Sequence, residues 1–395
     1  SPRHGIVERH PRKAPPMTDT PLDYATAGVD TAAGDRAVEL MKSAVAATHD
    51  STVLGATGGF AGMVDASALL GMEKPLLATS TDGVGTKIAI AQAMDVHETI
   101  GQDLVGMVVD DIVVIGARPV LMTDYIACGH VVPERIASIV TGIARACEAT
   151  GTPLIGGETA EHPGVMEPDD YDIAGAATGV VDASKLLGPE RVTGGDVVIA
   201  MASSGLHSNG YSLVRKVLNV AGWGLERQVD ELGRTIGEEL LEPTRVYAAD
   251  CLDLAAAFPV NGEDGTTGSG VRGFSHVTGG GLAANLARVL PQGLEGRVDR
   301  STWQIPAIFS LIGSLGNVPL ADLERTLNLG VGMIAIVDPS VAEAATKRLN
   351  DRGIPSWIMG DVVAAGEPEA NSADYIQGAK GVDGGAVRLL GSYAS

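Results

Sequence analysis

The stretch 75-PLLATSTDGVGTK-87 contains the first clear transition from a strand to a loop in this chain. Its apolar first half predicts a buried strand, and its second half adds glycines, hydroxyls and a lysine, which are typical of a loop that holds phosphate. A Walker loop needs Gly-Lys-Ser/Thr after a four-residue gap, and the dinucleotide fingerprint needs G-x-G-x-x-G. The stretch fits neither pattern, and Asp82 stands where a carboxylate would repel a phosphate.

Strands and helices alternate on both sides of that stretch. Apolar residues recur with helical spacing from residue 35, and a long apolar helix is expected at 98–117. The alternation predicts an α/β, or α+β layered, fold of two domains with a boundary near 183–195. Further strands are expected at 120–129, 153–156, 171–181, 196–205 and 329–337, with helices at 133–149 and 211–220.

Composition and charge favour a soluble, cytoplasmic protein. The 395 residues carry a formal net charge of -21, which excludes a broad surface for nucleic acid or anionic membranes, because such binding depends on positive charge. The three cysteines are widely spaced and predict reduced thiols rather than a zinc site. Residues 1–16 are basic and proline-rich without the apolar core of a signal peptide, and no run approaches the roughly 18 apolar residues of a membrane span.

Acidic residues in apolar surroundings need partners. Asp103, Asp110 and Asp111 lie in the expected helix, where either ion pairs, for instance with Arg118, or a bound Mg²⁺ would satisfy them. Glu158, in 156-GGETAEHPG, follows a strand at the end where open α/β sheets gather ligands, although a solvated loop is the alternative.

Two glycine-rich segments of the second half each precede a helix. They are 203-SSGLHSNGYSLVRKVL and 276-HVTGGGLAANLARVL, whose free backbone N–H groups could receive anions, although such segments can also be simple turns. A helix N-terminus contributes only about 0.3–1 kcal/mol toward a nearby charge, and about 2 kcal/mol when partly buried. That cannot neutralise a triphosphate, so the sequence predicts Mg²⁺ held by Asp82, Asp111 and Glu158, and two phosphorylated ligands of which one is a nucleotide.

Six segments occur in an order that resembles one family. They are 80-STDGVGTK, 110-DDIVVIGARP, 156-GGETAEHPG, 205-GLHSNGYSLVRK, 276-HVTGGG and 330-GVGM, and over roughly residues 22–365 the chain is similar to the phosphoribosylformylglycinamidine cyclo-ligases, the aminoimidazole ribonucleotide synthetases of purine biosynthesis. The resemblance implies ATP-dependent ring closure of formylglycinamidine ribonucleotide to aminoimidazole ribonucleotide. It also implies a homodimer whose N-terminal domains pair through their sheets.

The resemblance assigns domains and roles to the residues. The basic, proline-rich start predicts a disordered extension at 1–20, and the resemblance implies an ATP-binding and dimerisation domain at 21–185, a substrate domain at 186–370 and a tail at 371–395. It implies catalytic roles for Asp82, Lys87, Asp111, Glu158 and His207, of which Asp82, Asp111 and Glu158 would hold the metal. Contacts to ATP are expected from Lys42, Gly58, Gly59, Thr81, Asp82, Gly83, Gly85, Thr86, Lys87, Asp110 and Gly157, and contacts to the substrate from His207, Ser208, Asn209, Gly210, Thr278, Gly279 and Gly280.

Some positions depart from the family pattern. The segment 24-YATAGVD lacks the usual lysine and acid, Asp110 stands where asparagine is usual, and His162 stands where methionine is usual. Two other functions remain as alternatives: a catalytically silent nucleotide-binding assembly subunit, and another ATP-using enzyme of the same fold, such as thiamine-monophosphate kinase.

Overall fold

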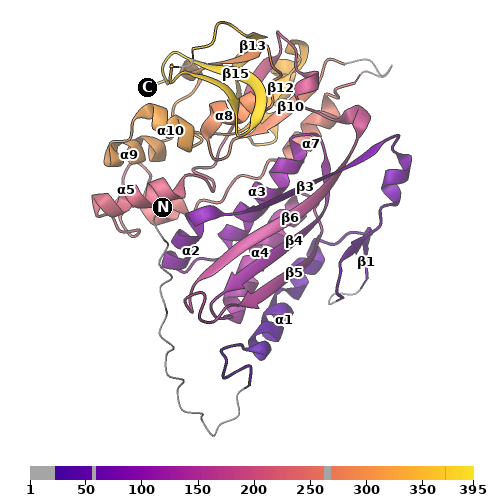
Figure 1. Ribbon diagram of the computed structural model, residues 1–395, viewed down its shortest axis with the longest axis vertical. Helices are drawn as coiled ribbons and strands as arrows, with labels where there is room; N and C mark the ends of the chain where they lie inside the picture. Colours follow the sequence, from indigo (N-terminus) through magenta and orange to yellow (C-terminus); the bar gives the residue numbers. More distant parts are fainter. Residues whose placement is uncertain (1–22, 56–58, 262–267, 370) are drawn as a thin grey trace, which may run out of the picture.

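The computed structural model describes residues 23–55, 59–261, 268–369 and 371–395, which are organised around one sheet in each half of the chain (Figure 1). The expected extension at 1–20 and Gly58 lie outside these residues. The predicted α/β class with two layered domains is confirmed. The expected boundary between residues 185 and 186 falls after the last strand of the first sheet and before the first strand of the second.

Four strands form the N-terminal sheet, in the order β3-β6-β4-β5. Strands β4 and β5 run parallel and the other neighbouring pairs run antiparallel. A register shift follows Met122 in β4, so that Met122 pairs with Leu154 whereas Thr123 pairs with Gly156. The strands are β3 (Pro75–Gly83), β4 (Arg118–Cys128), β5 (Leu154–Glu161) and β6 (Tyr171–Asp182).

Helices cover one face of this sheet. Helix α3 (Thr99–Val113) packs on β3, β4 and β6, and α4 (Pro133–Ala149) packs on α3. The proline at the first position of α4 suits a helix start, because its missing N–H would have no partner there. At the crossing, a Cβ on Gly142 would lie 1.8 Å from the carbonyl oxygen of Glu98, so only glycine permits this approach.

The other face of the N-terminal sheet is open. Leu77 of β3 is 69% exposed and Tyr125 of β4 is 43% exposed, and alternate residues of β3 are exposed in the same way. This alternation is expected of a strand with one covered and one uncovered face.

Seven strands form the C-terminal sheet, in the order β10-β12-β7-β13-β11-β15-β14. The segment 371–395, expected to be a tail, instead contributes two of them, and β15 pairs in parallel with β11. Strand β12 is buried along its whole length, which explains its unbroken run of apolar and small residues. The strands are β7 (Val197–Ala202), β10 (Val271–His276), β11 (Leu294–Asp299), β12 (Val331–Val337), β13 (Ser356–Ala364), β14 (Tyr375–Ala379) and β15 (Val382–Leu390).

The remaining elements surround the two sheets. No helix within the described ranges is long and apolar enough to cross a membrane. The helices are α1 (Thr31–Ala47), α2 (Ile88–Met94), α5 (Tyr211–Ala221), α6 (Ile236–Leu240), α7 (Ala248–Ala257), α8 (Gly281–Arg288), α9 (Ala307–Gly316), α10 (Leu320–Thr326) and α11 (Ala342–Asp351), and the short strands are β1 (Val53–Leu54), β2 (Met63–Val64), β8 (Gln228–Val229) and β9 (Arg234–Thr235).

The two domains share one apolar core along α3. This helix contacts α7 and β10 of the second half as well as its own sheet, and a single cluster of buried residues includes Val105 and Val109 of α3 together with Tyr247 and Cys251. The domains are therefore packed against each other rather than tethered by a linker.

Candidate active site

Three loops meet where the two domains pack together. They are residues 82–87 after β3, residues 207–212 at the start of α5, and residues 276–281 between β10 and α8. The N–H of Gly279 donates to the side-chain oxygen of Asn209 at 3.0 Å, which ties the second loop to the third. These loops and Asp111 are called the junction site below.

The first loop is held against the second. A Cβ on Gly85 would lie 3.6 Å from the carbonyl oxygen of Ser208, and the hydroxyl oxygens of Thr86 and Ser212 are 3.1 Å apart. Gly85 has a φ of +55°, a conformation that glycine adopts without strain. The stretch 80-STDGVGTK thus bends onto the C-terminal domain.

Asp82 and Asp111 form an acid pair at this junction. The Asp82 carboxylate accepts the N–H of Gly83 at 2.7 Å, and Asp111 accepts a hydrogen bond from Nδ1 of His276 at 2.8 Å. Burial raises the pKa of Asp82; the Gly83 hydrogen bond lowers it, and the charge of Asp111 raises it further. Because the two carboxylates repel each other, the pair would gain from a cation placed between them.

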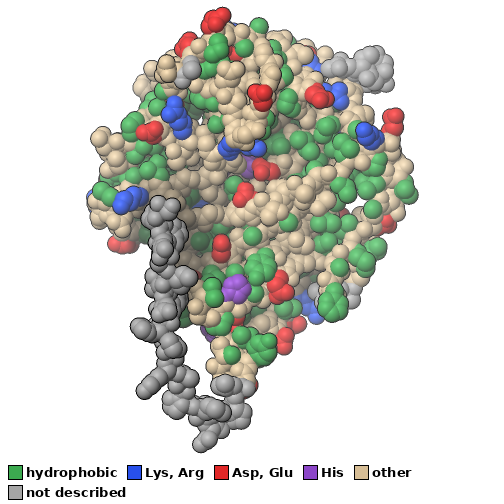
Figure 2. Space-filling view, viewed as in Figure 1, with side chains coloured by type: hydrophobic (Ala, Val, Ile, Leu, Met, Phe, Trp, Pro, Cys, Tyr) green, Lys and Arg blue, Asp and Glu red, His purple; other side chains and the backbone are tan. Residues whose placement is uncertain are grey.

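His276 received no role from the sequence, although it begins the segment 276-HVTGGG. Its side chain is 4% exposed. Burial lowers its pKa, but the hydrogen bond with Asp111 and the charges of Asp110, Asp111 and Asp82 outweigh burial and raise the pKa above the usual value. Acidic, basic and histidine side chains gather near the junction between the sheets in Figure 2.

Lys87 does not face the loop surface, contrary to the prediction that it would face phosphates. Its side chain is fully buried, and Nζ donates to Asp103 Oδ1 at 2.8 Å, to the carbonyl oxygen of His207 at 2.9 Å and to that of Glu242 at 2.7 Å. Three acceptors require three N–H donors, which only the charged ammonium has. The ion pair therefore joins the first domain to two loops of the second.

The acids of α3 have structural partners. Asp103 Oδ1 also accepts the N–H of Thr244 at 2.8 Å, its hydroxyl at 2.6 Å and the hydroxyl of Ser208 at 3.2 Å. Asp110 is fully buried and accepts the N–H of Tyr247 at 3.0 Å, and burial raises its pKa to about 7. The ion-pair alternative is thus correct for Asp103, with Lys87 rather than Arg118, and Asp110 faces the domain interface rather than an open ATP site.

His207 lies inside the second loop. Its ring is 1% exposed, and Nε2 accepts the N–H of Ser204 at 3.1 Å. Burial, together with the charges of His276, Lys87 and Arg245, holds the pKa of His207 well below its usual value, so the ring is neutral. The ring is buried rather than exposed to a ligand in the junction site, contrary to the prediction that it would line the substrate side. Its backbone, with a φ of +61°, shapes the loop instead.

The third loop carries the remaining residues expected to bind substrate. Thr278, Gly279 and Gly280 are partly exposed, and Gly280 has a φ of +101° before α8 begins. Asn285 lies beneath this turn and donates to the carbonyl oxygens of Gly281 at 2.7 Å and Thr278 at 3.1 Å. Gly210 precedes α5 with a φ of +77°, so both helices begin from left-handed glycines.

The three acids expected to hold a metal are not brought together in this chain. Asp82 and Glu158 lie on β3 and β5, the two edge strands, which at about 4.8 Å per strand are ~14 Å apart. Glu158 pairs with the exposed Tyr125 and so lies on the open face, whereas Asp82 alternates with the exposed Leu77 and Thr81 and so lies on the helix face. Over the described ranges, no group of three or more His, Cys, Asp or Glu side chains could hold a metal ion.

The other residues expected to contact ATP are also dispersed. Lys42 projects from α1, with a 58% exposed side chain 3.8 Å from Glu39. Gly59 and Thr81 are exposed. A Cβ on Gly157 would lie 2.0 Å from Oδ1 of Asp124. Within one chain, these positions do not form a nucleotide pocket with Asp82.

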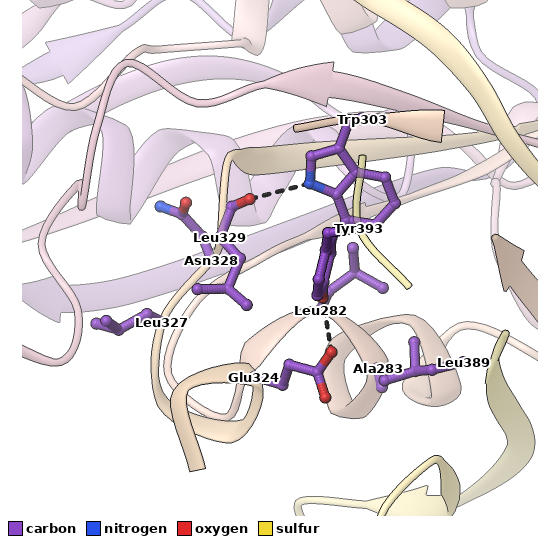
Figure 3. A pocket seen from close by; sticks show the side chains of 9 residues that line it. All are labelled: Leu282, Ala283, Trp303, Glu324, Leu327, Asn328, Leu329, Leu389 and Tyr393. Carbon is purple, nitrogen blue, oxygen red and sulfur yellow. Dashed lines mark hydrogen bonds between the residues drawn. The ribbon is translucent and has the colours of Figure 1, made fainter. Parts of the chain in front are cut away.

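A pocket lies beside α8, whose Leu282 and Ala283 line it (Figure 3). Trp303 Nε1 donates to the carbonyl oxygen of Leu329 at 3.0 Å, and the Tyr393 hydroxyl donates to Glu324 at 2.7 Å. Glu324 also pairs with the buried Arg300 at 2.7 Å. Because these polar groups satisfy one another, the pocket supports α8 rather than offering free groups to a ligand.

Comparison with known proteins agrees with this organisation. Residues 64–181 match the N-terminal domain, and residues 193–371 the C-terminal domain, of the AIR synthase related proteins. The phosphoribosylformylglycinamidine cyclo-ligase of Desulfitobacterium hafniense (strain DSM 10664 / DCB-2) is 45% identical over 344 residues, which are 87% of this chain and 97% of the relative. The chain belongs to the phosphoribosylformylglycinamidine cyclo-ligase family. The cyclo-ligase of Sorangium cellulosum (strain So ce56) is likewise 45% identical, over 88% of this chain and 97% of the relative.

Solved structures share the fold of this cyclo-ligase family member. Thiamine-monophosphate kinase from Stenotrophomonas maltophilia K279a superposes with a TM-score of 0.61 at 16% identity, covering 91% of this chain and 97% of that chain. The Escherichia coli hydrogenase maturation protein HypE superposes with a TM-score of 0.57 at 17% identity, covering 90% of this chain and 93% of that chain. At these identities the likeness shows the fold alone.

Proposed function

We propose that the protein catalyses the ATP-dependent ring closure of formylglycinamidine ribonucleotide to aminoimidazole ribonucleotide, with release of ADP and phosphate. The observation that carries this proposal is 45% identity over 97% of a relative that bears the cyclo-ligase name. The junction site supports it, because it places two glycine-rich helix starts beside an acid pair.

In the proposed reaction, the formyl oxygen of the substrate attacks the terminal phosphorus of ATP, and the bond from that phosphorus to ADP breaks. The amidine nitrogen then attacks the activated carbon, and phosphate leaves with the former formyl oxygen as the ring closes. A nitrogen proton passes to solvent or to a nearby base. Such chemistry needs positioning and charge stabilisation more than a protein nucleophile.

The residues of the junction site supply positioning. Backbone N–H groups at the starts of α5 and α8 suit the phosphate of a ribonucleotide, because left-handed glycines allow close approach. His276 holds the Asp111 carboxylate in place through the 2.8 Å hydrogen bond.

Asp82 and Asp111 are the proposed carboxylates for Mg²⁺, which commonly binds one or two carboxylates together with waters and substrate phosphates. Their mutual repulsion and partial exposure fit this role. When bound, Mg²⁺ would offset the charge of the phosphate oxygens. Glu158 belongs to a different region, because it lies on the open sheet face.

We further propose that the open face pairs with that of a second copy and that nucleotide binds near the pairing. Leu77 and Tyr125 would be buried by such a contact, and Glu158 and Thr81 would lie beside it. Sedimentation equilibrium tests the pairing: the protein should behave as a dimer, and Tyr125→Glu should shift it toward the monomer. A monomeric wild-type protein would contradict this proposal.

The activity is tested by incubating the purified protein with formylglycinamidine ribonucleotide and Mg-ATP and measuring both aminoimidazole ribonucleotide and ADP. Stoichiometric formation of both products is expected. Absence of both would overturn the proposal. Parallel reactions with thiamine monophosphate test the alternative kinase activity, for which no diphosphate product is expected.

A further inference from the structure

The hairpin between β14 and β15 ends in an unusual turn. Lys380 and Gly381 are the two residues between the paired Ala379 and Val382, and both have left-handed backbones, with φ of +53° and +76°. Two-residue turns with positive φ at both positions favour asparagine followed by glycine. Lysine adopts this conformation at a cost, and such costs concentrate at functional positions.

The Lys380 side chain extends over the third loop of the junction site. Its Nζ donates to Asn285 Oδ1 at 2.9 Å and lies 3.4 Å from the Thr278 hydroxyl. A Cβ on Gly280 would lie 3.0 Å from Lys380 Cε, so glycine at this position also leaves room for the lysine. The buried Asn285 amide is fixed by two backbone carbonyls, which directs its oxygen toward Lys380.

Within the part of the chain that the structure describes, Lys380 forms no salt bridge with an acid. Both of its hydrogen-bond partners are neutral, and no carboxylate of the described residues lies within salt-bridge distance of Nζ. Burial lowers the pKa of Lys380, and the nearby Arg288 lowers it further, whereas Asp111 and Asp82 act in the opposite direction. Lys380 is exposed, and the charges of Asp111 and Asp82 stabilise its ammonium without a direct salt bridge to either carboxylate.

We infer that Lys380 is a substrate-binding residue that contacts the phosphate of the ribonucleotide where it binds to the 278–281 turn. This inference rests on the proposed function. It adds a residue from beyond position 371, where the match to the AIR synthase related family ends. The strained turn places the ammonium over the loop.

The decisive variant is Lys380→Asn, because asparagine favours the left-handed turn but cannot reach the 278–281 loop. The expected result is an unchanged or higher Tm, a KM for formylglycinamidine ribonucleotide raised about tenfold or more, and an unchanged KM for ATP. Lys380→Arg keeps the charge and should recover most of the lost affinity. Lys347→Asn, at an exposed lysine of α11 paired with Asp351, is the matched control and should leave both KM values unchanged.

Calorimetric titration with ribose 5-phosphate provides a readout that does not depend on turnover. Weaker binding to Lys380→Asn than to wild type supports the inference even if the wild-type protein forms no aminoimidazole ribonucleotide, a failure that would count against the proposed reaction alone. Equal affinities of the two proteins for ribose 5-phosphate would overturn the inference. So would a loss confined to kcat or to the KM for ATP, because it would place the ammonium at the transferred phosphoryl group instead.

Discussion

Replacement of Lys87 by methionine would remove the cation that pairs with the fully buried Asp103 while keeping most of the side-chain volume. The carboxylate would stay buried without its charge partner, and the carbonyl oxygens of His207 and Glu242 would each lose a donor. Breaking a buried pair in this way costs about 3–5 kcal/mol. At about 2.1 cal/mol/K per residue, the unfolding entropy of the chain is ~0.8 kcal/mol/K, so Tm should fall by about 4–6 °C.

Differential scanning calorimetry of the purified variant measures this shift, and Lys42→Met at an exposed position of α1 is the control. Adding Asp103→Asn to Lys87→Met removes the unpaired charge and should recover part of the lost Tm. A variant with unchanged Tm but abolished turnover would refute the structural role of Lys87 and would favour a phosphate contact.

Three further predictions concern the acid pair, a buried carboxyl and the helix crossing. Asp82→Asn should abolish turnover, measured as product formation, while leaving Tm unchanged. Glu190→Gln, at an exposed position, is the control. Turnover equal to that of wild type would show that Asp82 does not belong to the site. Burial raises the pKa of Asp124 to about 7, so the folded state keeps a proton that the unfolded state releases, and stability falls as pH rises from about 4 to about 7. The stability advantage of Asp124→Asn over wild type, measured as the difference in Tm, should therefore grow between pH 5 and pH 8 by the equivalent of ~2–3 kcal/mol. Tm curves of the two proteins that stay parallel across this pH range would contradict the burial argument. Gly142→Ala, whose Cβ would lie 1.8 Å from a backbone oxygen, should cost about 3 kcal/mol or more in urea unfolding, whereas Gly71→Ala, with open space around it, should cost little.

Local sequence patterns predicted most elements of the fold. The apolar stretch at 98–117 became α3, which ends at Val113. The strand at 75–83 became β3, but its alternate residues are exposed, so the prediction that it is buried was wrong. The β14–β15 hairpin was not predicted, because its turn is Lys380-Gly381 rather than the asparagine-glycine pair that signals such hairpins, and its segment lacks clear alternation. The pairing of β15 with β11, far away in the sequence, leaves no local signal.

Three loops picked out from the sequence meet at the junction site, but the directions of their side chains were not predicted. The Lys87 ammonium meets Asp103 and two carbonyls that come from three separate segments, and no spacing in the sequence reports such a convergence. Glu158 was grouped with Asp82, but the register shift after Met122 and the strand order place Glu158 at the opposite edge and on the opposite face. A one-residue change of register moves every side chain to the other face, and the sequence does not show it.

The contact between Asp103 and Thr244 has a consequence for synthesis on the ribosome. The two residues are 141 positions apart, so at about 5–20 residues per second the α3 carboxylate waits ~7–28 s for its later partners to emerge. Until then α3 exposes both its acids and the apolar residues that later pack on α7. The surface of α3 that packs on α7 therefore reaches its final packing only when the C-terminal half has been made.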